Sequence, residues 1–537
     1  MDSNVIPAPV LVEGKPGSLK LKPEIEIVAR KKYQFMVDTI VSALDLRLGR
    51  NCCNLRYLEN EKDSDEAKLV SGKVPIILRE EMGVTKSQNF EGYVLEINDS
   101  SVVIRGESEA GLFYGIETFI QLLPEPREEP QQELEISCIK IIDYPRFPWR
   151  GFMLDVGRHF FPPEEVKRLL DVMEILKMNR FHWHLTEDQG WRIEIEKYPK
   201  LVEIGSVRKD TQIGGILSKK REGKPHSGYY TQEEIRDIVE YARRRYIEVI
   251  PEVDIPGHST AALAAYPEYS CREQSIEVET TFGIKKDVFC VGKEKTFEFL
   301  FNVIDEIIKL FPSKIFHLGG DEVPKDRWKE CPACQSRIKE LGLKDEDDLQ
   351  VYFTNRISEY LKSKGWRVMG WNEILGAGVD PSAIAQYWAR SEQPTIEHLR
   401  NGGNAVFSKF GHIYLDYNYG LTPLRKSYEY EPIPDALEEE YRNNVLGIET
   451  PMWTEWARNT TRLQWQIFPR LIAVSETGWT SKHLKNYTRF RKTLENLYPS
   501  LKRMGIKPAP LAVVDPKGVK RWILLLKSLK EPYVPEK

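Results

Sequence analysis

Two adjacent carboxylates, Asp321 and Glu322, follow a hydrophobic run at residues 314–318 and a glycine pair, Gly319 and Gly320. The hydrophobic run predicts a buried strand, in which neighbouring side chains point to opposite faces. Adjacent acids can therefore serve one site only where the strand has ended, and glycines permit such a break. The acid pair indicates proton transfer to a bond that is being broken. Taken alone, it is equally compatible with Asp321 capping a following helix.

Such acids need several strand ends to surround them, and the sequence from residue 149 onward repeats a strand, loop and helix pattern. Helical patterns occur at residues 164–177 and 232–244, whereas residues 417–434, after the seventh strand, resemble a loop. Eight repeats predict a (β/α)8 TIM barrel in the α/β class, with its chemistry at the C-terminal strand ends. The expected strands begin near Arg150, Arg180, Ile247, Lys314, Arg367, Ala383, Ala405 and Val445.

The part before the barrel alternates short strand-like runs with turn residues and has one clear helical pattern, at residues 109–123. Residues 93–97 and 102–105 predict a hairpin. Proline-rich stretches at residues 124–130 and 144–148 mark a boundary. We therefore expect a small α+β domain at residues 1–143, a barrel domain at 144–505 and a C-terminal helical extension at 506–537.

The charge and hydropathy of the sequence limit the kinds of partner that the chain is expected to have. Its 537 residues include 77 Lys plus Arg against 81 Asp plus Glu, so neither nucleic acid nor an anionic membrane is an expected partner. No apolar stretch has the length of about 18 residues that a membrane span needs, and the first 17 residues lack the features of an export signal. Seven cysteines, few and odd in number, suit reduced thiols. A cytoplasmic location is the expectation.

Two places in the sequence are candidate metal sites. Cys331 and Cys334 form a CxxC, but a structural zinc site needs four ligands and no second CxxC exists, so we expect no metal and no cofactor. Cys271 and Cys290 flank a loop, and whether they pair stays open. An HxH pair at residues 182–184 suits a metal-dependent hydrolase, but the chain has only nine histidines, so this alternative is less favoured.

Acids, an arginine and tryptophans collect at the expected strand ends. Aromatic faces stack on the C–H surfaces of sugar rings and charged groups bind hydroxyls, so the combination predicts a sugar site. A single tryptophan could instead pack in the core, and Arg150 could form a structural ion pair. A sugar-binding protein without chemistry would not need the acid pair. These strand-end residues are Arg150, Asp155, His182, His184, Asp188, Asp254, His258, Trp371, Trp388, Tyr414, Asp416, Trp453 and Glu455.

Several segments resemble one family. HLGGDE, at residues 317–322, with PEVDIPGH upstream at 251–258, is similar to glycoside hydrolase family 20, whose main members are β-N-acetylhexosaminidases. The resemblance extends over residues 145–160, 179–192, 228–242, 368–373 and 452–455. It implies a small α+β domain before the barrel and retaining, substrate-assisted hydrolysis, in which the 2-acetamido oxygen of the sugar attacks the anomeric carbon.

The resemblance also implies roles for individual residues. Glu322 would protonate the leaving oxygen and later activate water, while Asp321 would orient the acetamido group and Tyr414 would donate to its oxygen. The other implied roles are apolar walls for Trp371, Trp388 and Trp453, binding of the 3- and 4-hydroxyls for Arg150, binding of the 4- and 6-hydroxyls for Asp416 and Glu455, and tuning of Glu322 by His258 and Asp254.

The implied activity is removal of terminal β-linked GlcNAc or GalNAc from a carbohydrate partner. A lacto-N-biosidase, which releases a disaccharide, is the alternative within the family. Such a pocket would have to stay open near the 3- and 4-hydroxyls, which the acids and arginine would close. A monomer or a homodimer is expected.

Overall fold

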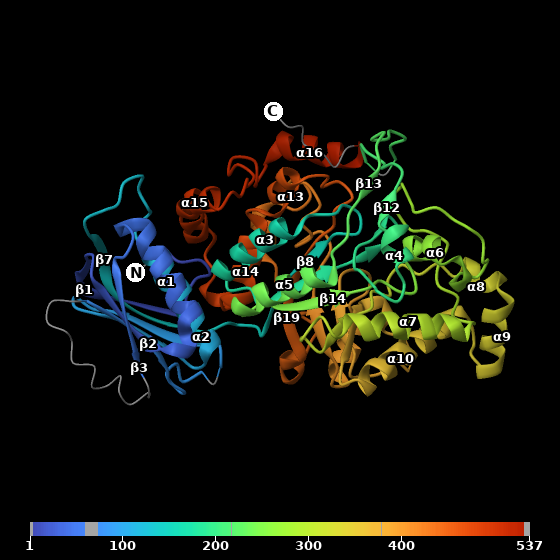
Figure 1. The fold of residues 1–537 in the computed structure, drawn as a ribbon, viewed down its shortest axis with the longest axis horizontal. Helices are drawn as coiled ribbons and strands as arrows, with labels where there is room; N and C mark the ends of the chain where they lie inside the picture. Colours follow the sequence, from blue (N-terminus) through green and yellow to red (C-terminus); the bar gives the residue numbers. More distant parts are fainter. Residues whose placement is uncertain (1–3, 59–73, 88, 216, 377, 531–537) are drawn as a thin grey trace. The chain divides into compact units, whose positions relative to one another are not determined.

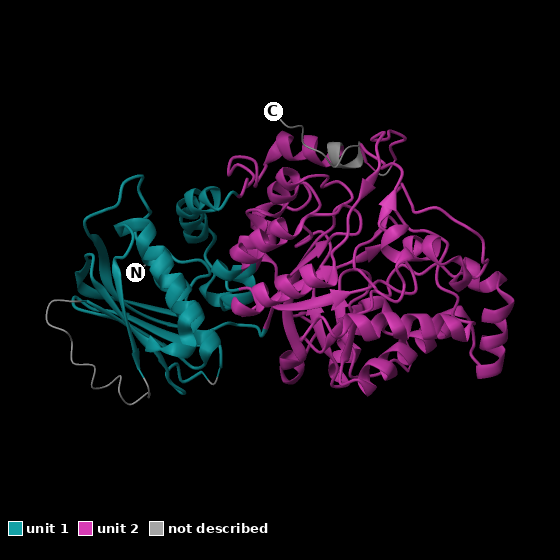
Figure 2. Ribbon diagram, viewed as in Figure 1, with its two compact units in different colours: residues 1–148, 174–177, 475–505 teal, residues 149–173, 178–474, 506–537 magenta. Residues whose placement is uncertain are grey.

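The computed structural model describes residues 4–58, 74–87, 89–215, 217–376 and 378–530. The chain forms two compact units (Figure 2). Unit 1 comprises residues 1–148, 174–177 and 475–505, and unit 2 comprises residues 149–173, 178–474 and 506–537. Residues 475–505, which the sequence assigned to the barrel domain, thus group with unit 1.

Unit 1 contains a seven-stranded mixed sheet with helices α1 (Gln34–Leu48) and α2 (Glu109–Leu122) packed against it (Figure 1). The expected hairpin is present, because β5 and β6 pair antiparallel from Tyr93 opposite Gly106 to Ile97 opposite Val102. Helix α15 (Tyr487–Arg503) also belongs to this unit. The strands lie in the order β1 (Leu11–Leu21), β7 (Leu134–Asp143), β5 (Tyr93–Ile97), β6 (Val102–Gly106), β4 (Pro75–Glu80), β2 (Ile25–Arg30) and β3 (Cys53–Leu58).

Unit 2 is built on a closed barrel of parallel strands, which confirms the predicted (β/α)8 fold. The barrel closes where β19 pairs with β8, from Gly447 opposite Trp149 to Met452 opposite Leu154. Each expected strand start has a strand, and the irregular seventh unit holds the short helix α12 (Leu424–Glu429) and a 3-10 helix at Glu439–Asn444. In order, the strands are β8 (Trp149–Asp155), β9 (Arg180–His184), β14 (Glu248–Glu252), β15 (Ile315–His317), β16 (Arg367–Trp371), β17 (Ile384–Tyr387), β18 (Asn404–Phe407) and β19 (Val445–Met452).

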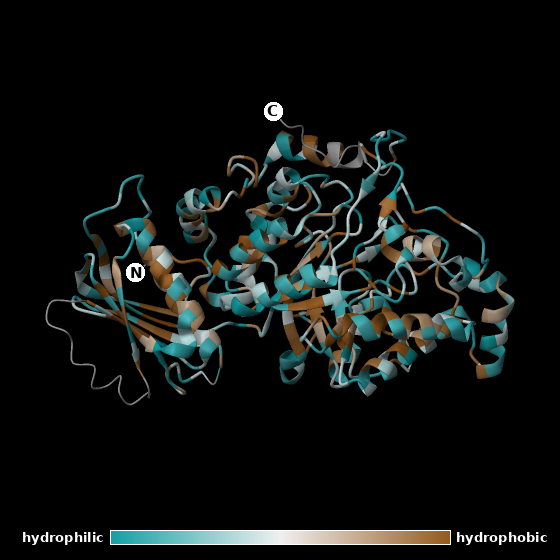
Figure 3. Ribbon diagram, in the orientation of Figure 1, coloured by the Kyte–Doolittle hydropathy of each residue, from teal (hydrophilic) through white to brown (hydrophobic). Residues whose placement is uncertain are grey.

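The barrel strands are buried on both faces, as parallel strands covered by helices must be. All of β8 is buried, and Figure 3 shows apolar colour along the barrel strands and mixed colour on the helices. Helix α5 (Gln232–Arg244) shows how the outer layer is specified: Thr231 and Glu234 form a capping box at its start, and its apolar stripe is buried. A core cluster inside unit 2 joins five strands through Trp149, Ile250, Met369, Ile384 and Val406.

The remaining helices follow the strands or lie in loops. Helix α16 falls within the expected C-terminal extension. Among the described helices, none combines the length and the apolar character needed to cross a membrane. Their bounds are α3 (Pro163–Ile175), α4 (Lys200–Glu203), α6 (Thr260–Ala265), α7 (Glu294–Ile307), α8 (Asp326–Glu330), α9 (Pro332–Leu341), α10 (Glu346–Ser363), α11 (Gln393–Arg400), α13 (Thr460–Ile467), α14 (Arg470–Trp479) and α16 (Gly518–Lys530).

Candidate active site

A cavity of about 140 Å³ lies at the C-terminal ends of the barrel strands. Of the residues to which the family resemblance gives a role, all but Arg150 and Asp254 line it; of the other strand-end residues, Asp155, His182, His184 and Asp188 do not. The lining comprises Arg158, His258, Asp321, Glu322, Trp371, Trp388, Phe410, Tyr414, Asp416, Tyr417, Trp453 and Glu455.

The acid pair follows the break that the glycines were expected to make. Strand β15 ends at His317, and Gly319 and Gly320 have φ values of +70° and +87°. A Cβ on Gly319 would lie 2.0 Å from Oδ1 of Asp254, so only glycine fits where the chain passes this side chain. The amide of Gly320 donates to the same oxygen over 3.2 Å. Asp254 thus stands behind the acid pair and holds the turn.

Asp321 is buried and lies five residues before α8, whose N-cap is Lys325, so it does not cap that helix. Burial raises the pKa of Asp321 to about 7; His258 opposes the rise, and the charges of Glu373 and Glu322 add to it. Its Oδ1 has no hydrogen-bond partner among the described residues. A buried acceptor that lines a cavity is normally paired, so this oxygen is suited to a donor on a ligand.

Glu322 has a different environment. Its side chain is 30% exposed, and its Oε2 lies 3.7 Å from Nε2 of His258. On the other side of the ring, Nδ1 of His258 lies 3.1 Å from Glu187 Oε2 and 3.3 Å from Asp188 Oδ2. Burial disfavours the charged ring, but these two carboxylates hold the pKa of His258 well above its usual value. A cationic imidazole therefore faces Glu322.

Aromatic rings form the walls of the cavity. The rings of Trp371 and Trp453 have centroids 5.6 Å apart, and Trp388 stacks on Tyr414 at 6.3 Å. Nε1 of Trp371 donates to Glu252 over 3.0 Å, which fixes that ring from within the barrel. Burial raises the pKa of Tyr414 well above its usual value, so its phenol stays a hydrogen-bond donor.

Three charged side chains, Arg158, Asp416 and Glu455, line another part of the cavity. Nη2 of Arg158 lies 2.7 Å from Glu187 Oε1, and its Cζ lies 4.7 Å from the centre of the Trp453 ring. Burial raises the pKa of both Asp416 and Glu455. Nη1 of Arg158, Oδ1 of Asp416 and Oε2 of Glu455 are buried without a hydrogen-bond partner in the described parts of the chain. Three open polar positions beside aromatic rings are the arrangement that a sugar with several hydroxyls requires.

Arg150 does not line this cavity, which corrects its expected placement. It is the second residue of the seven-residue strand β8, so it lies at the N-terminal end of the strand, opposite to the cavity. It is buried, and its backbone amide donates to Asn179 Oδ1 over 3.0 Å. Arg158 follows the C-terminal end of the same strand and occupies the cavity instead. Sequence reasoning missed Arg158 and Glu187, although both lie just after expected strand ends.

The HxH pair belongs to a network inside the barrel. Nδ1 of His182 lies 2.7 Å from Glu449 Oε1, and its Nε2 lies 2.9 Å from Glu252 Oε2. Nδ1 of His184 bonds Glu252, and its Nε2 lies 3.2 Å from Glu187 Oε1. Every ring nitrogen of the pair thus faces a carboxylate, and those carboxylates in turn hold Trp371 and His258. The pair positions the site from behind.

The chain matches two descriptions of one family: "Glycosyl hydrolase family 20, catalytic domain" over residues 147–482 and "Glycosyl hydrolase family 20, domain 2" over residues 2–144. It is 38% identical over 523 residues to a β-hexosaminidase of Porphyromonas gingivalis, covering 94% of this chain and 64% of that protein, less than two thirds of its length. It is 36% identical to a β-hexosaminidase of Vibrio furnissii, covering 76% of this chain and 68% of that one.

Solved structures agree with the sequence matches. An exo β-N-acetylglucosaminidase of Vibrio harveyi, solved with N-acetylglucosamine, is 30% identical with a TM-score of 0.81, covering 95% of this chain and 79% of that one. A mutant β-hexosaminidase of Streptomyces plicatus, solved with the product GlcNAc, is 29% identical with a TM-score of 0.80, covering 95% and 97%. With its sheet domain, its barrel and its acid pair, the chain belongs to glycosyl hydrolase family 20.

Proposed function

We propose that the chain is an exo-acting β-N-acetylhexosaminidase that removes terminal β-linked N-acetylhexosamine from oligosaccharides or glycoconjugates. The observation that carries the proposal is the contrast between two adjacent acids in one cavity. Asp321 is buried with an unpaired oxygen and a raised pKa, whereas Glu322 is partly exposed and faces His258. Environments that differ in this way assign different roles to two carboxyl groups.

Glu322 acts as the general acid and base. As the acetamido oxygen of the sugar attacks the anomeric carbon, the bond to the leaving oxygen breaks and Glu322 gives its proton to that oxygen. Water then attacks the anomeric carbon, its proton returns to Glu322, and the bond to the acetamido oxygen breaks. Two inversions leave the configuration retained. His258, held by Glu187 and Asp188, stabilises the carboxylate between the two steps.

Asp321 and Tyr414 hold the acetamido group that serves as the nucleophile. The unpaired Oδ1 of Asp321 accepts the acetamido N–H and, once ionised, stabilises the positive charge that grows on its nitrogen. The Tyr414 phenol donates to the acetamido oxygen. Trp371, Trp388 and Trp453 surround the acetyl methyl and the sugar ring. Positioning of an internal nucleophile contributes effective molarities of about 10⁵ to 10⁸ M.

The charged group of Arg158, Asp416 and Glu455 supports exo action. In this proposal Arg158, rather than Arg150, binds the 3- and 4-hydroxyls, and Asp416 and Glu455 bind the 4- and 6-hydroxyls. A disaccharide-releasing enzyme needs room for a second sugar at those hydroxyls, where the buried Arg158 and the partly buried Asp416 and Glu455 lie. The lacto-N-biosidase alternative is therefore the less favoured.

Paired p-nitrophenyl β-glycosides of GlcNAc, GalNAc and glucose test the proposal, with Asp321→Asn as the impaired control. Both N-acetylhexosaminides should be hydrolysed, the glucoside should be inert because it lacks the nucleophile, and a thiazoline mimic of the cyclised intermediate should inhibit. Comparable turnover of the glucoside and the N-acetylglucosaminide would exclude substrate assistance. Release of a disaccharide from lacto-N-tetraose without terminal monosaccharide would favour the alternative.

A further inference from the structure

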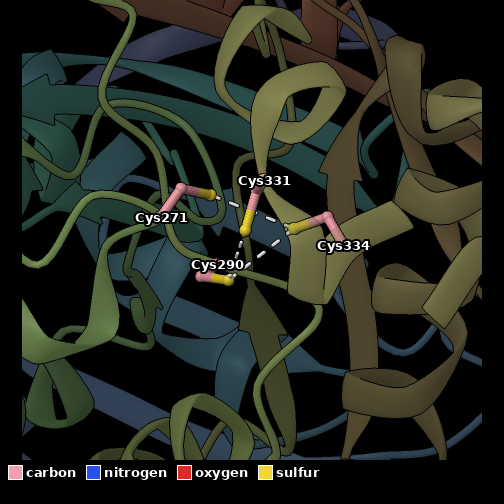
Figure 4. Close-up of side chains that lie close together, drawn as sticks. All are labelled: Cys271, Cys290, Cys331 and Cys334. Carbon is pink, nitrogen blue, oxygen red and sulfur yellow. Dashed lines mark hydrogen bonds between the residues drawn. The ribbon is translucent and has the colours of Figure 1, made fainter. Parts of the chain in front are cut away.

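Four cysteines of unit 2 converge outside the cavity (Figure 4). Sγ of Cys290 lies 3.6 Å from Sγ of both Cys331 and Cys334, and Sγ of Cys271 lies 3.9 Å from Sγ of Cys334. All four sulfur atoms lie within 4.8 Å of one another, and three of the four residues are buried. Figure 4 shows the side chains pointing toward a common centre.

The spacing matches a tetrahedral metal site. Four sulfurs that each lie 2.3 Å from a central zinc ion are about 3.8 Å apart. Three of the six sulfur–sulfur separations, at 3.6, 3.6 and 3.9 Å, bracket this edge length, and the other three lie within 4.8 Å. A disulfide brings two sulfurs to about 2.05 Å, and all seven cysteines have free thiols. We propose that Cys271, Cys290, Cys331 and Cys334 bind one structural zinc ion as four thiolates.

The choice of zinc and of a structural role follows from the donor set. Soft thiolates in a tetrahedral arrangement select zinc or iron among the common metals. Four protein ligands leave no open position for water or substrate, which is the mark of a structural rather than a catalytic site. Among the described residues that line the candidate active site, none is a cysteine, so the proposed ion takes no part in hydrolysis.

The helix α9 presents two of the ligands. Cys331 is its N-cap residue and Cys334 lies three positions further, so both sulfurs face the same end of the helix. Cys290 reaches them because Gly292 packs on the first turn of α9: a Cβ there would lie 2.2 Å from the carbonyl carbon of Ala333. The scaffold brings these three thiols together through backbone packing.

The fourth ligand is held by the segment before the loop. The amide of Cys290 donates to the carbonyl of Tyr269 over 2.9 Å, and Ser270 pairs with Phe289 in an isolated antiparallel bridge. Nζ of Lys293 donates to the carbonyl of Ser270 over 2.5 Å. Cys271 follows Ser270 directly and is thereby placed beside Cys334. The two ends of the loop and the start of α9 meet at the sulfurs.

The proposed ion would hold together the two loops that carry His258 and Glu322. The amide of Phe289 donates to the carbonyl of Pro256, two residues before His258. Nε1 of Trp328, in α8 after Glu322, donates to the carbonyl of Phe289 over 2.9 Å. Zinc bound at the adjacent cysteines would lock the segment of His258 against the segment that follows Glu322. This inference rests on the cysteine geometry and stands whether or not the proposed substrate is right.

The metal content and thiol count of the full chain test the proposal. Protein purified without chelator should contain one zinc per chain by plasma mass spectrometry. A mercurial reagent should release that zinc as it titrates the thiols, and the denatured protein with chelator should show all seven cysteines as free thiols. These measurements need no variant. Iron in place of zinc, absence of a bound metal, or fewer than seven free thiols from disulfide formation would each overturn the proposal.

Variants assign the ion to this cluster. Cys331→Ser should lose zinc and lower the melting temperature, whereas Cys331→His, which supplies another zinc ligand, should keep the ion. Cys138→Ser is the matched control, because Cys138 is 3% exposed and Cys331 is 4% exposed but only Cys331 belongs to the cluster. Equal zinc content in Cys331→Ser and Cys138→Ser would place the metal elsewhere and refute the assignment.

Discussion

Replacing Arg158 by lysine keeps the positive charge of the cavity but removes the planar guanidinium. Nη2 of Arg158 lies 2.7 Å from Glu187 Oε1, while Nη1 lies 3.6 Å from Asp155 Oδ2 and has no hydrogen-bond partner in the described chain. Because an ammonium lacks the guanidinium's fixed fork, it cannot hold Glu187 and a sugar hydroxyl in the same geometry. The variant should therefore lose the hydrogen bond that Nη1 makes to the substrate.

The size of the loss in kcat/KM follows from the one hydrogen bond that the unpaired Nη1 would make to the substrate. One hydrogen bond to a charged group contributes about 1.5 to 3 kcal/mol, and 1.36 kcal/mol corresponds to tenfold in rate, so kcat/KM should fall about 10- to 150-fold. Arg150→Lys is the control, because Arg150 is buried at the far end of β8. Its expected effect is on the melting temperature, with kcat/KM per folded molecule nearly unchanged.

The assay compares p-nitrophenyl N-acetylglucosaminide with its 3-deoxy and 4-deoxy analogues. The wild-type enzyme should lose activity on the deoxy sugar whose hydroxyl Arg158 binds, and Arg158→Lys should lose much less on that sugar, because the bond is already gone. Fully additive losses for both analogues would show that Arg158 contacts neither hydroxyl. A loss of kcat/KM in Arg150→Lys as large as in Arg158→Lys would also refute the reasoning.

Three further predictions concern the acid pair and its turn. Glu322→Gln should lower kcat/KM least on dinitrophenyl glycosides and most on natural glycosides, and the two losses should differ by a factor approaching about 10² to 10⁴. The loss of kcat/KM in Asp321→Asn should persist for every leaving group. If both variants showed the same dependence on the leaving group, the assigned roles would be contradicted. The pKa of Asp321 rises from 3.8 to about 7 on folding, so its contribution to stability is present below pH 3.8 and is lost as the pH rises to about 7. Asp321→Asn should therefore raise the melting temperature more at pH 8 than at pH 5, and equal increments would argue against a buried charge. Gly319→Ala should lower both stability and activity more than Gly342→Ala, since both glycines have positive φ but only Gly319 is crowded, by Asp254; equal losses of stability would point to backbone strain alone.

The local pattern of the chain was enough to predict most of the fold. Strand and helix repeats reflect burial periodicity, which each segment carries in its own residues, so every expected barrel strand is found. The glycine break before Asp321 was likewise predictable, because only glycine tolerates that turn. The division between the units was less predictable from the sequence, because residues 475–505 group with unit 1 through contacts with segments far away in the sequence.

By itself, the sequence determined the barrel, the acid pair and the aromatic residues around it, because short motifs bring those groups to strand ends. Only the tertiary structure decided which arginine enters the cavity, since a strand pattern does not show that Arg150 stands at the start of β8 and Arg158 beyond its end. The same holds for the cysteines. Cys271 and Cys290 lie far in sequence from Cys331 and Cys334, and their convergence depends on backbone packing that no local pattern encodes.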